Sequence, residues 1–448
     1  MNYTETIAQL GDDARQMENL FRSAQRSGED AEFAQAIEAL YALAPQNLLY
    51  AAWWHRLAAR ANGEGDVPTS TTPGVASRIV WQTAIAIGVV NGLLFWWLSD
   101  VKNFPILDGV PFVAVVWAPL YAIFLTAFLL VTGRRSMRHW LILALGLTVA
   151  VVYVVAVARW RGDLALRSPV SLLLLIHLPA LALYGTGFFV LWGDRSPLAS
   201  FAALIKAIEA IITAGIFLAA GVLFTGLTFG LFQAIGIQPP DWMMRLFAAG
   251  GMGLVPVLAV AAIYRPDAPP QEQSFKQGLS WLIALVLRLM LPLALAVAIV
   301  YIALIPFNFM QPFRNRDTLI VYNAMLFAVF GLIVGATPVY ETDVPVALRR
   351  WLRWGLLALT AFALLVAIYA MSAVIYRTWQ AGLTPNRVTV IGWNLVNIGI
   401  LGQLLYRQWR SNAANWLAAL QATVNDGLNW YVIWTVALML TIPWLFGK

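Results

Sequence analysis

Lys206 and Glu209 form the pair of charged residues best placed for chemistry, because both lie in a long apolar run. A spacing of three residues puts the two side chains on one face of a helix, where ammonium and carboxylate can pair. A charge at the centre of a membrane span costs about 2.5–3.5 kcal/mol, so such residues are candidates for a functional site. Two interpretations stay open. The pair either anchors one end of a span at the membrane surface, or it forms a polar site within a helical bundle, with Glu209 as carrier of a proton or cation.

Arg288 interrupts the apolar stretch at 279–309 and is the next candidate. If the apolar core of this stretch runs from about Leu289 to Phe309, Arg288 lies at its end and its guanidinium reaches the headgroups. Otherwise Arg288 contributes a positive charge to a polar site within the bundle.

Asn394 and Asn397 lie on one face of a later apolar segment. In lipid, side-chain amides of this kind commonly join helices through hydrogen bonds worth about 0.6–2 kcal/mol each. The alternative is that the two asparagines line a ligand cavity. The sequence does not decide between these two roles.

The loop Gly382–Arg387 reads GLTPNR and joins two apolar segments. Thr384 fits the N-cap of the second helix, and Pro385 fits its first turn. Gly382 permits a left-handed turn after the first helix. Helix-start chemistry leaves Asn386 and Arg387 unexplained. Together with Arg377, which ends the preceding segment, they are candidates for binding an anionic headgroup or carboxylate near a helix N-terminus.

This loop and its flanks also carry a resemblance. The segment 370–407 (AMSAVIYRTWQAGLTPNRVTVIGWNLVNIGILGQLLYR) and the proline-containing span at 287–309 resemble the uncharacterised bacterial integral-membrane family catalogued as domain of unknown function 4153. The likeness covers roughly residues 200–410 and depends mainly on the GLTPNR loop. It departs from the family at Val388, where an aromatic residue is usual. The resemblance implies a bacterial membrane protein and no particular activity.

Patterns for an enzyme are missing from the sequence. There is no H-E-x-x-H, no G-x-S-x-G, no Walker loop and no cysteine, and His55, His139 and His177 are far apart. We therefore expect no metal and no cofactor. An enzyme that acts on lipid or a lipid-linked substrate stays the alternative function, although the sequence offers no acid–base pair for it.

The elements that must position these residues are membrane-spanning helices. The chain of 448 residues is 60% hydrophobic and 11% charged, whereas soluble domains carry about 25% charged residues. Its apolar runs have the length of about 20 residues that a helix needs to cross a bilayer. The prediction is an all-α polytopic bundle of about eleven spans. Their expected limits are 79–98, 111–132, 140–157, 169–192, 210–235, 243–264, 283–306, 318–338, 354–376, 388–406 and 428–446.

Two of these spans contain notable glycines. Gly226 and Gly230 in the fifth span have the small-xxx-small spacing of closely packed helices. Gly250, Gly251 and Gly253 predict that the sixth span is easily broken.

Three segments are expected outside the spans. Residues 1–62 predict a small cytoplasmic unit made of a helical hairpin, with helices over 31–44 and 46–60, and residues 63–77 form a Gly/Pro/Thr-rich linker before the membrane domain at 78–448. Arg407–Asp426 repeats apolar residues along one narrow stripe, which predicts an amphipathic helix at the membrane surface. Pro345–Trp354 has a similar pattern.

Lys and Arg placement predicts the orientation. With the N-terminus inside, about twice as many basic residues flank the inner ends of the spans as the outer ends. The first 30 residues are polar and acidic, unlike a signal peptide, so we expect a cytoplasmic N-terminus in a prokaryotic inner membrane. Basic residues at span ends indicate anionic lipid headgroups as partners, and the absence of an extramembrane basic stripe argues against nucleic acid.

These patterns favour a non-enzymatic integral membrane protein. It is either a transporter-like bundle or a scaffold whose N-terminal unit, residues 1–62, docks a protein partner.

Overall fold

The computed structural model describes residues 3–10, 13–27, 29–61, 73–103, 105–107, 110–133, 135–163 and 167–446. The chain divides into two compact units, Met1–Arg78 and Ile79–Lys448. Each unit has its own hydrophobic core.

Over residues 3–61, apart from the undescribed positions, the N-terminal unit has the helices α1 (Tyr3–Leu10), α2 (Ala14–Ser27), α3 (Asp30–Leu43) and α4 (Leu48–Ala61). The predicted helices over 31–44 and 46–60 correspond to α3 and α4. The prediction of a hairpin was nevertheless wrong, because α1 and α2 complete the unit. Phe21 of α2 packs against Phe33 of α3 and Trp53 of α4, with ring centroids 5.2 and 5.0 Å away. A hairpin alone would have left these aromatic rings exposed.

The predicted linker at 63–77 overlaps the first membrane helix, since α5 begins at Pro73. Residues 62–72 lie outside the described residues.

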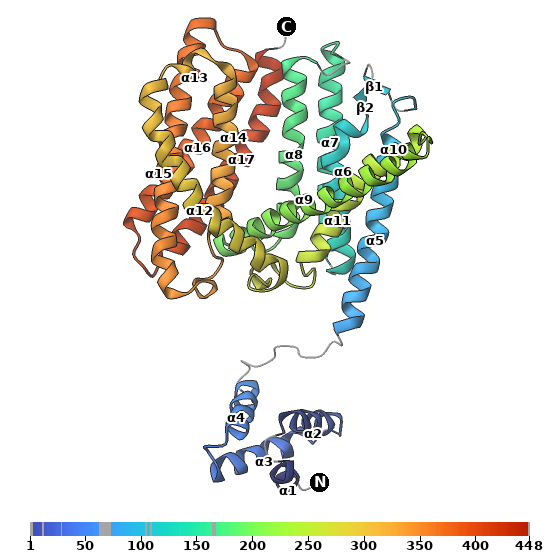
Figure 1. Cartoon of the computed structure of the whole chain (residues 1–448), viewed down its shortest axis with the longest axis vertical. Helices are drawn as coiled ribbons and strands as arrows, with labels where there is room; N and C mark the ends of the chain where they lie inside the picture. The colour runs from blue at the N-terminus through green and yellow to red at the C-terminus, as the bar shows by residue number, and fades with distance from the viewer. Residues whose placement is uncertain are drawn as a thin grey trace. The chain divides into compact units, whose positions relative to one another are not determined.

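Within the described residues of the membrane unit, eleven helices are long and apolar enough to cross a bilayer, the number that the sequence predicted. The fold is all-α apart from one short hairpin, and the chain is an integral, multi-pass membrane protein. Figure 1 shows most of these helices running side by side. Their bounds are α5 (Pro73–Leu98), α6 (Val113–Thr132), α7 (Met137–Trp160), α8 (Pro169–Val190), α9 (Pro197–Ala234), the continuous sixth span made of α10 (Asp241–Arg245), the π-helical turn η1 (Leu246–Gly250) and α11 (Gly251–Ile263), α12 (Gly278–Leu304), α14 (Arg316–Ala336), α15 (Val346–Ala381), α16 (Pro385–Arg410) and α17 (Trp416–Leu445).

Short elements connect these helices on both sides of the bundle. They are the hairpin β1 (Pro105–Leu107) and β2 (Val110–Pro111), the 3₁₀ turns η2 (Pro270–Glu272), η3 (Ile305–Asn308) and η4 (Glu341–Asp343), and the single-turn helix α13 (Gln311–Arg314).

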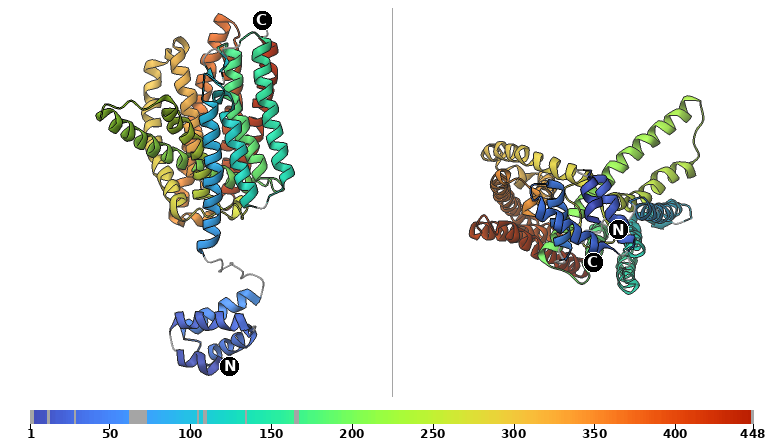
Figure 2. Two further views of the ribbon diagram at one scale, coloured as in Figure 1. Left: turned by 90° about the vertical axis from the view of Figure 1, so that its right-hand side faces the viewer. Right: turned by 90° about the horizontal axis from the view of Figure 1, so that it is seen from below.

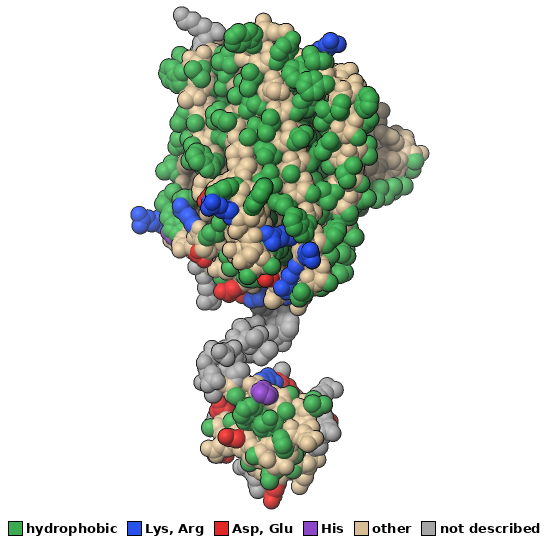
Figure 3. Space-filling model, turned by 90° about the vertical axis from the view of Figure 1, so that its left-hand side faces the viewer, with side chains coloured by type: hydrophobic (Ala, Val, Ile, Leu, Met, Phe, Trp, Pro, Cys, Tyr) green, Lys and Arg blue, Asp and Glu red, His purple; other side chains and the backbone are tan. Residues whose placement is uncertain are grey.

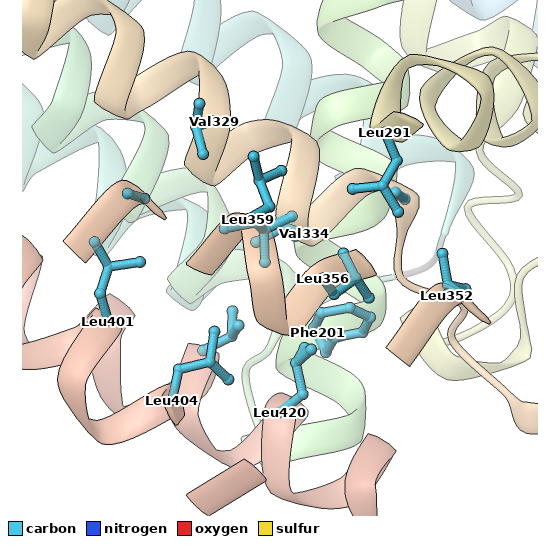
Figure 4. Packing of buried hydrophobic residues seen from close by; sticks show 14 of the residues in the cluster. Phe201, Leu291, Val329, Val334, Leu352, Leu356, Leu359, Leu401, Leu404 and Leu420 are labelled. Carbon is cyan, nitrogen blue, oxygen red and sulfur yellow. The ribbon is translucent and has the colours of Figure 1, made fainter. Parts of the chain in front are cut away.

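The two largest hydrophobic clusters of the membrane unit, which we call its larger and smaller core, gather different groups of helices. The larger core gathers residues of α9, α12 and α14–α17, and in Figure 4 Leu352 and Leu356 of α15 lie around Phe201 of α9. The smaller core gathers residues of α5–α8 with the C-terminal part of α17, where Leu438 belongs to the same cluster as Leu174 of α8. Helix α17 therefore contributes to both cores.

The two predicted surface helices are parts of spans instead. Residues 407–410 end α16, and 416–426 begin α17. The apolar stripe of this segment, including Trp416, Leu417 and Leu420, is buried in the larger core. Likewise 346–354 begins α15, and Leu352 is fully buried. A stripe of this kind fits a membrane surface and a neighbouring helix equally well, and here it packs against helices.

The fifth and sixth spans form an oblique arm. Helix α9 crosses the direction of the other helices, and its second half extends away from the bundle together with α10 (Figures 1 and 2). A Cβ atom added at Gly226 or Gly230 would meet nothing within 4 Å, so the predicted close packing is absent there. The predicted break in the sixth span is absent, because η1 is a π-helical turn and the chain stays helical from Asp241 to Ile263. Gly253, beyond this turn, packs closely against Gly92 of α5.

Basic side chains gather at one end of the membrane unit, beneath a largely hydrophobic surface (Figure 3). We call this end the basic face. It is formed by the loops that join α6 to α7, α8 to α9, α11 to α12, α14 to α15 and α16 to α17. Its basic residues include Arg135, Arg138, Arg195, Arg265, Lys276, Arg349, Arg350, Arg353, Arg407 and Arg410.

Candidate functional site

Lys206 and Glu209 form an ion pair inside the membrane unit. The ammonium of Lys206 lies 2.8 Å from Oε2 of Glu209, and each side chain is only 3% exposed. The hydroxyl of Ser280 on α12 donates to the same Oε2 at 2.6 Å and accepts from Lys206 at 2.9 Å. The sequence predicted the pairing, and both side chains are buried between α9, α12 and the loop that precedes α12.

Local sequence signals at the starts of α9 and α12 build this arrangement. Ser196 caps α9 by accepting from the backbone N–H of Ala199, and Pro197 occupies the first turn. The loop before α12 ends at Gly278, whose positive φ of 59° lets the chain turn into the helix. This loop supplies the carbonyl of Ser274, which accepts from Lys206 at 2.7 Å.

The remaining surroundings of Lys206 are aromatic. Its ammonium lies 4.6 Å from the centroid of the Phe275 ring, a distance at which a ring face attracts a cation. Lys206 thus has a carboxylate, a hydroxyl, a carbonyl and an aromatic ring around it, and all its hydrogen bonds can be satisfied without water.

A small cavity, lined mainly by apolar residues, adjoins the pair. It has a volume of about 20 Å³, and a buried water needs roughly 10–15 Å³ of such space. Glu209 and Arg288 line it from α9 and α12, and Thr337 and Asp343 line it from the connection between α14 and α15. Two acidic residues and an arginine are therefore among the residues that line one space of the size of a water molecule.

Arg288 belongs to this site. Its Nε donates to the carbonyl of Ala336, with a distance of 3.3 Å, and its side chain is half-buried. The side chain of Arg288 is therefore intermediate in exposure, between α12 and the end of α14. Of the two interpretations of Arg288, the one in which it adds a positive charge to a polar site agrees with this position.

Asp343 connects the cavity to the basic face. Its side chain is 6% exposed and lies 3.3 Å from the ammonium of Lys276, which is 55% exposed. The backbone N–H of Tyr340 also donates to Asp343, at 2.9 Å. Burial, together with the carboxylates of Asp343 and Glu272, raises the pKa of the Tyr340 phenol. The protonated phenol donates to the carbonyl of Gln271 at 2.5 Å, which fixes this loop beneath the cavity.

The arrangement suits a proton better than a large ligand. A buried ion pair is costly to desolvate, and it becomes more costly when one partner loses its charge. A carboxylate beside a water-sized space can accept a proton that arrives through that space. Within the described residues, no three His, Asp or Glu side chains gather as metal ligands.

Asn394 and Asn397 lie elsewhere and join helices. The amide of Asn394 donates to Asn323 of α14 at 3.1 Å, and Tyr431 of α17 donates to Asn397 at 2.5 Å. Both asparagines are buried, and neither lines the cavity beside Glu209. Both asparagines thus form hydrogen bonds between helices, as in the first of the two roles considered for them.

Sequence reasoning missed a further polar contact between helices. The indole N–H of Trp393 on α16 donates to Nε2 of His177 on α8 at 3.0 Å. The other ring nitrogen of His177 lies 2.7 Å from the carbonyl of Leu173, so Nδ1 carries the proton. His177 interrupts an apolar span, which is a usable signal, but its partner is too distant in sequence for any spacing rule.

The loop between α15 and α16 has the predicted helix-start chemistry. The hydroxyl of Thr384 accepts from the backbone N–H of Arg387, Pro385 begins α16, and Gly382 has a φ of 76°. Arg387 donates to the carbonyl of Gly382 and so closes its own loop. Asn386 is exposed, and one terminal nitrogen of Arg377 is buried without a hydrogen-bond partner. This loop lies at the opposite end of the bundle from the basic face.

No family model matches the chain, and no curated protein or solved structure matches it either.

Proposed function

We propose that the protein is a membrane transporter coupled to protons, with Glu209 as the group that binds the proton. The observation that carries this proposal is the buried Lys206–Glu209–Ser280 cluster beside a cavity that Arg288 and Asp343 also line. Ionisable groups are rare inside membrane spans because they are costly, and those that occur commonly serve ion or proton pathways.

The positions of the ionisable groups support an entry route. Lys276 is exposed at the basic face, Asp343 lies behind it, and the cavity connects Asp343 with Glu209. A proton that reaches the cavity would add to the carboxylate of Glu209 and neutralise it. Lys206 would lose its ionic partner but keep its hydrogen bonds to Ser280 and the Ser274 carbonyl. The site would then carry a net positive charge, which favours a rearrangement of α9 against α12.

The basic face is the proposed cytoplasmic side, in a bacterial inner membrane. The excess of Lys and Arg at this end of the spans supports this orientation. Protons would accordingly enter or leave Glu209 from the cytoplasm.

Charge displacement in reconstituted membranes tests the proposal without knowledge of the transported molecule. Proteoliposomes adsorbed on a solid-supported membrane receive a step in pH, and the transient current is recorded. The wild type should displace charge, and Glu209→Gln should reduce this charge to the level of protein-free liposomes. Glu341→Gln is the matched control, because Glu341 pairs with Arg349 at the same face outside the cavity.

The proposal is lost if wild-type currents equal those of empty liposomes, or if Glu209→Gln leaves them unchanged. Should Glu209→Gln fail to fold, Ser280→Ala keeps both charges and removes only the hydroxyl between them. It should shift the pH at which half of the charge moves.

A second candidate function is a scaffold, and the N-terminal unit favours it. This unit has its own core, yet Leu43 and Leu48 at the turn between α3 and α4 are 81% and 87% exposed. Exposed leucines on a small separate unit are typical of a protein-docking surface. A photo-crosslinking residue placed at Leu48 should form a discrete adduct in native membranes, whereas one placed at exposed Glu38 should not. Equal labelling from both positions would exclude this surface as a docking site.

A further inference from the structure

We propose that the ends of α7 and α8 at the basic face bind the headgroup of an anionic phospholipid. Five residues form the surface, which we call the aromatic–basic strip: Arg138, His139, Phe188, Trp192 and Arg195. This inference is independent of the proton-coupled function proposed for Glu209.

Four of the five residues contact one another through their rings and a guanidinium, and Arg138 precedes His139 in the sequence of α7. The guanidinium of Arg195 lies 4.0 Å from the centroid of Phe188, and Phe188 meets Trp192 edge to face at 5.0 Å. Trp192 in turn stacks on His139, with ring centroids 3.9 Å apart. A guanidinium held over an aromatic face has a fixed plane, and its N–H groups stay free to bind phosphate oxygens in pairs.

The positive charges of the strip have no acidic partner among the described residues. Arg138 and Arg195 are exposed, and neither takes part in an ion pair there. Asp194 is the acidic residue next to Arg195, but it accepts from the backbone N–H of Ser196 at 2.9 Å and from Gln271 at 3.1 Å. The carboxylate of Asp194 therefore forms hydrogen bonds within and between loops and does not pair with Arg195. The strip keeps a net positive charge that an anion can neutralise.

The surroundings favour a lipid over a soluble anion. Phe188 and Trp192 are 45% and 37% exposed at the end of a membrane helix, where aromatic residues meet headgroups. One helical turn beyond Arg138, the side chains of Leu141 and Ile142 are exposed on the same face of α7, and Leu145 continues that face. A phospholipid whose phosphate binds Arg138 would thus have its acyl chains against an apolar helix surface.

Lipid binding to the purified full-length protein tests the proposal. Native mass spectrometry measures occupancy by the first lipid during titration with dioleoyl phosphatidylglycerol, and separately with the zwitterionic phosphatidylcholine of the same chains. The wild type should prefer phosphatidylglycerol. Each basic residue near a membrane surface contributes about fivefold to anionic lipid binding, so Arg138→Gln and Arg195→Gln should each lower the apparent affinity by about that factor.

Matched variants distinguish lipid binding at the aromatic–basic strip from a nonspecific effect of the protein's positive charge. Arg314→Gln removes one exposed arginine at the opposite end of the bundle and should leave the affinity unchanged. Arg195→Lys keeps the charge but loses the planar stacking on Phe188, so its affinity should fall between wild type and Arg195→Gln.

Three results would overturn the proposal. The first is equal affinity of the wild type for the two lipids, and the second is wild-type affinity in the Arg138→Gln/Arg195→Gln double variant. The third is displacement of the bound lipid by millimolar inorganic phosphate, which would indicate a site for the free anion. Persistence of the lipid in phosphate, with loss in the double variant, supports the strip as a lipid site.

Discussion

At the scale of single residues, Lys206 and Glu209 depend on each other. Both are buried at 3% exposure, and the hydrogen bonds of Ser280 reach both. Neither charge has a second ionic partner within 4 Å among the described side chains. Removal of one partner would therefore leave a buried charge uncompensated, whereas removal of both would leave neither charge of the pair.

A double-mutant cycle tests this dependence. Lys206→Met should destabilise the protein by about 3–5 kcal/mol because Glu209 keeps its charge without a partner. Lys206→Met/Glu209→Met should recover most of that loss. Thermal or denaturant unfolding in detergent gives the free energies. Additive single-variant effects would contradict the tight coupling, and Arg265→Met at the exposed pair with Asp267 is the control with a smaller effect.

Gly253 on α11 is a second residue whose size matters. A Cβ atom added there would lie 2.8 Å from the Cα of Gly92 and 2.9 Å from the carbonyl oxygen of Asn91. Both are backbone atoms of α5 and cannot move alone. Asn91 also donates to the carbonyl of Gly253 at 2.6 Å, so the crossing combines close approach with a hydrogen bond.

Gly253→Ala should consequently lower the stability by about 1–3 kcal/mol, the usual cost of overpacking. Gly251→Ala is the matched control, since its added methyl group would meet nothing within 4 Å and alanine favours a helix. Melting temperatures of the two purified variants give the comparison. A Gly253→Ala variant as stable as Gly251→Ala would show that α5 and α11 separate at little cost.

At the scale of elements, the sequence predicted the spans and missed how some of them pack. All eleven spans were predicted because long apolar runs have few alternatives in a chain with so few charges. The stripe at 407–426 was misassigned because amphipathic periodicity does not distinguish lipid headgroups from a helix partner. The candidate site was predicted only in part, because sequence spacing indicates contacts within one helix and not contacts between helices. The spacing of Lys206 and Glu209 is local, whereas their partner Ser280 and the cavity residue Asp343 come from distant elements.

The link between α8 and α16 gives a prediction at the scale of elements. Trp393→Phe keeps the aromatic ring between His177 and Tyr431 but removes the indole N–H that binds His177. Interhelical hydrogen bonds in membranes contribute on average about 0.6 kcal/mol and at most about 1.7 kcal/mol. The variant should therefore lose stability within that range, measured by unfolding in detergent. A loss several times larger would mean that the ring itself, rather than its hydrogen bond, joins the helices.

At the scale of the whole molecule, the two cores of the membrane unit share α17. Leu420 belongs to the larger core and Leu438 to the smaller one, and both are 2% exposed. Eighteen helical positions separate them, which corresponds to about 27 Å at 1.5 Å per residue. Substitutions at such a distance commonly act independently.

Leu420→Ala and Leu438→Ala should each cost about 2–5 kcal/mol. In the double variant the two losses should add to within about 0.5 kcal/mol. Equilibrium unfolding in mixed detergent micelles gives the three free energies. A double variant much more stable than the sum would mean that one of the cores is already disrupted in a single variant.

The continuity of α17 also has a mechanical consequence. Because one uninterrupted helix is embedded in both cores, neither group of helices can rotate without turning or bending it. Gly427 lies between the two embedded parts, with Ile400 of α16 pressed against its backbone, so a bend at this point would displace α16 as well. A movement of α9 against α12 would thus be transmitted through α17 to α6–α8 as a rotation or bend of that one helix.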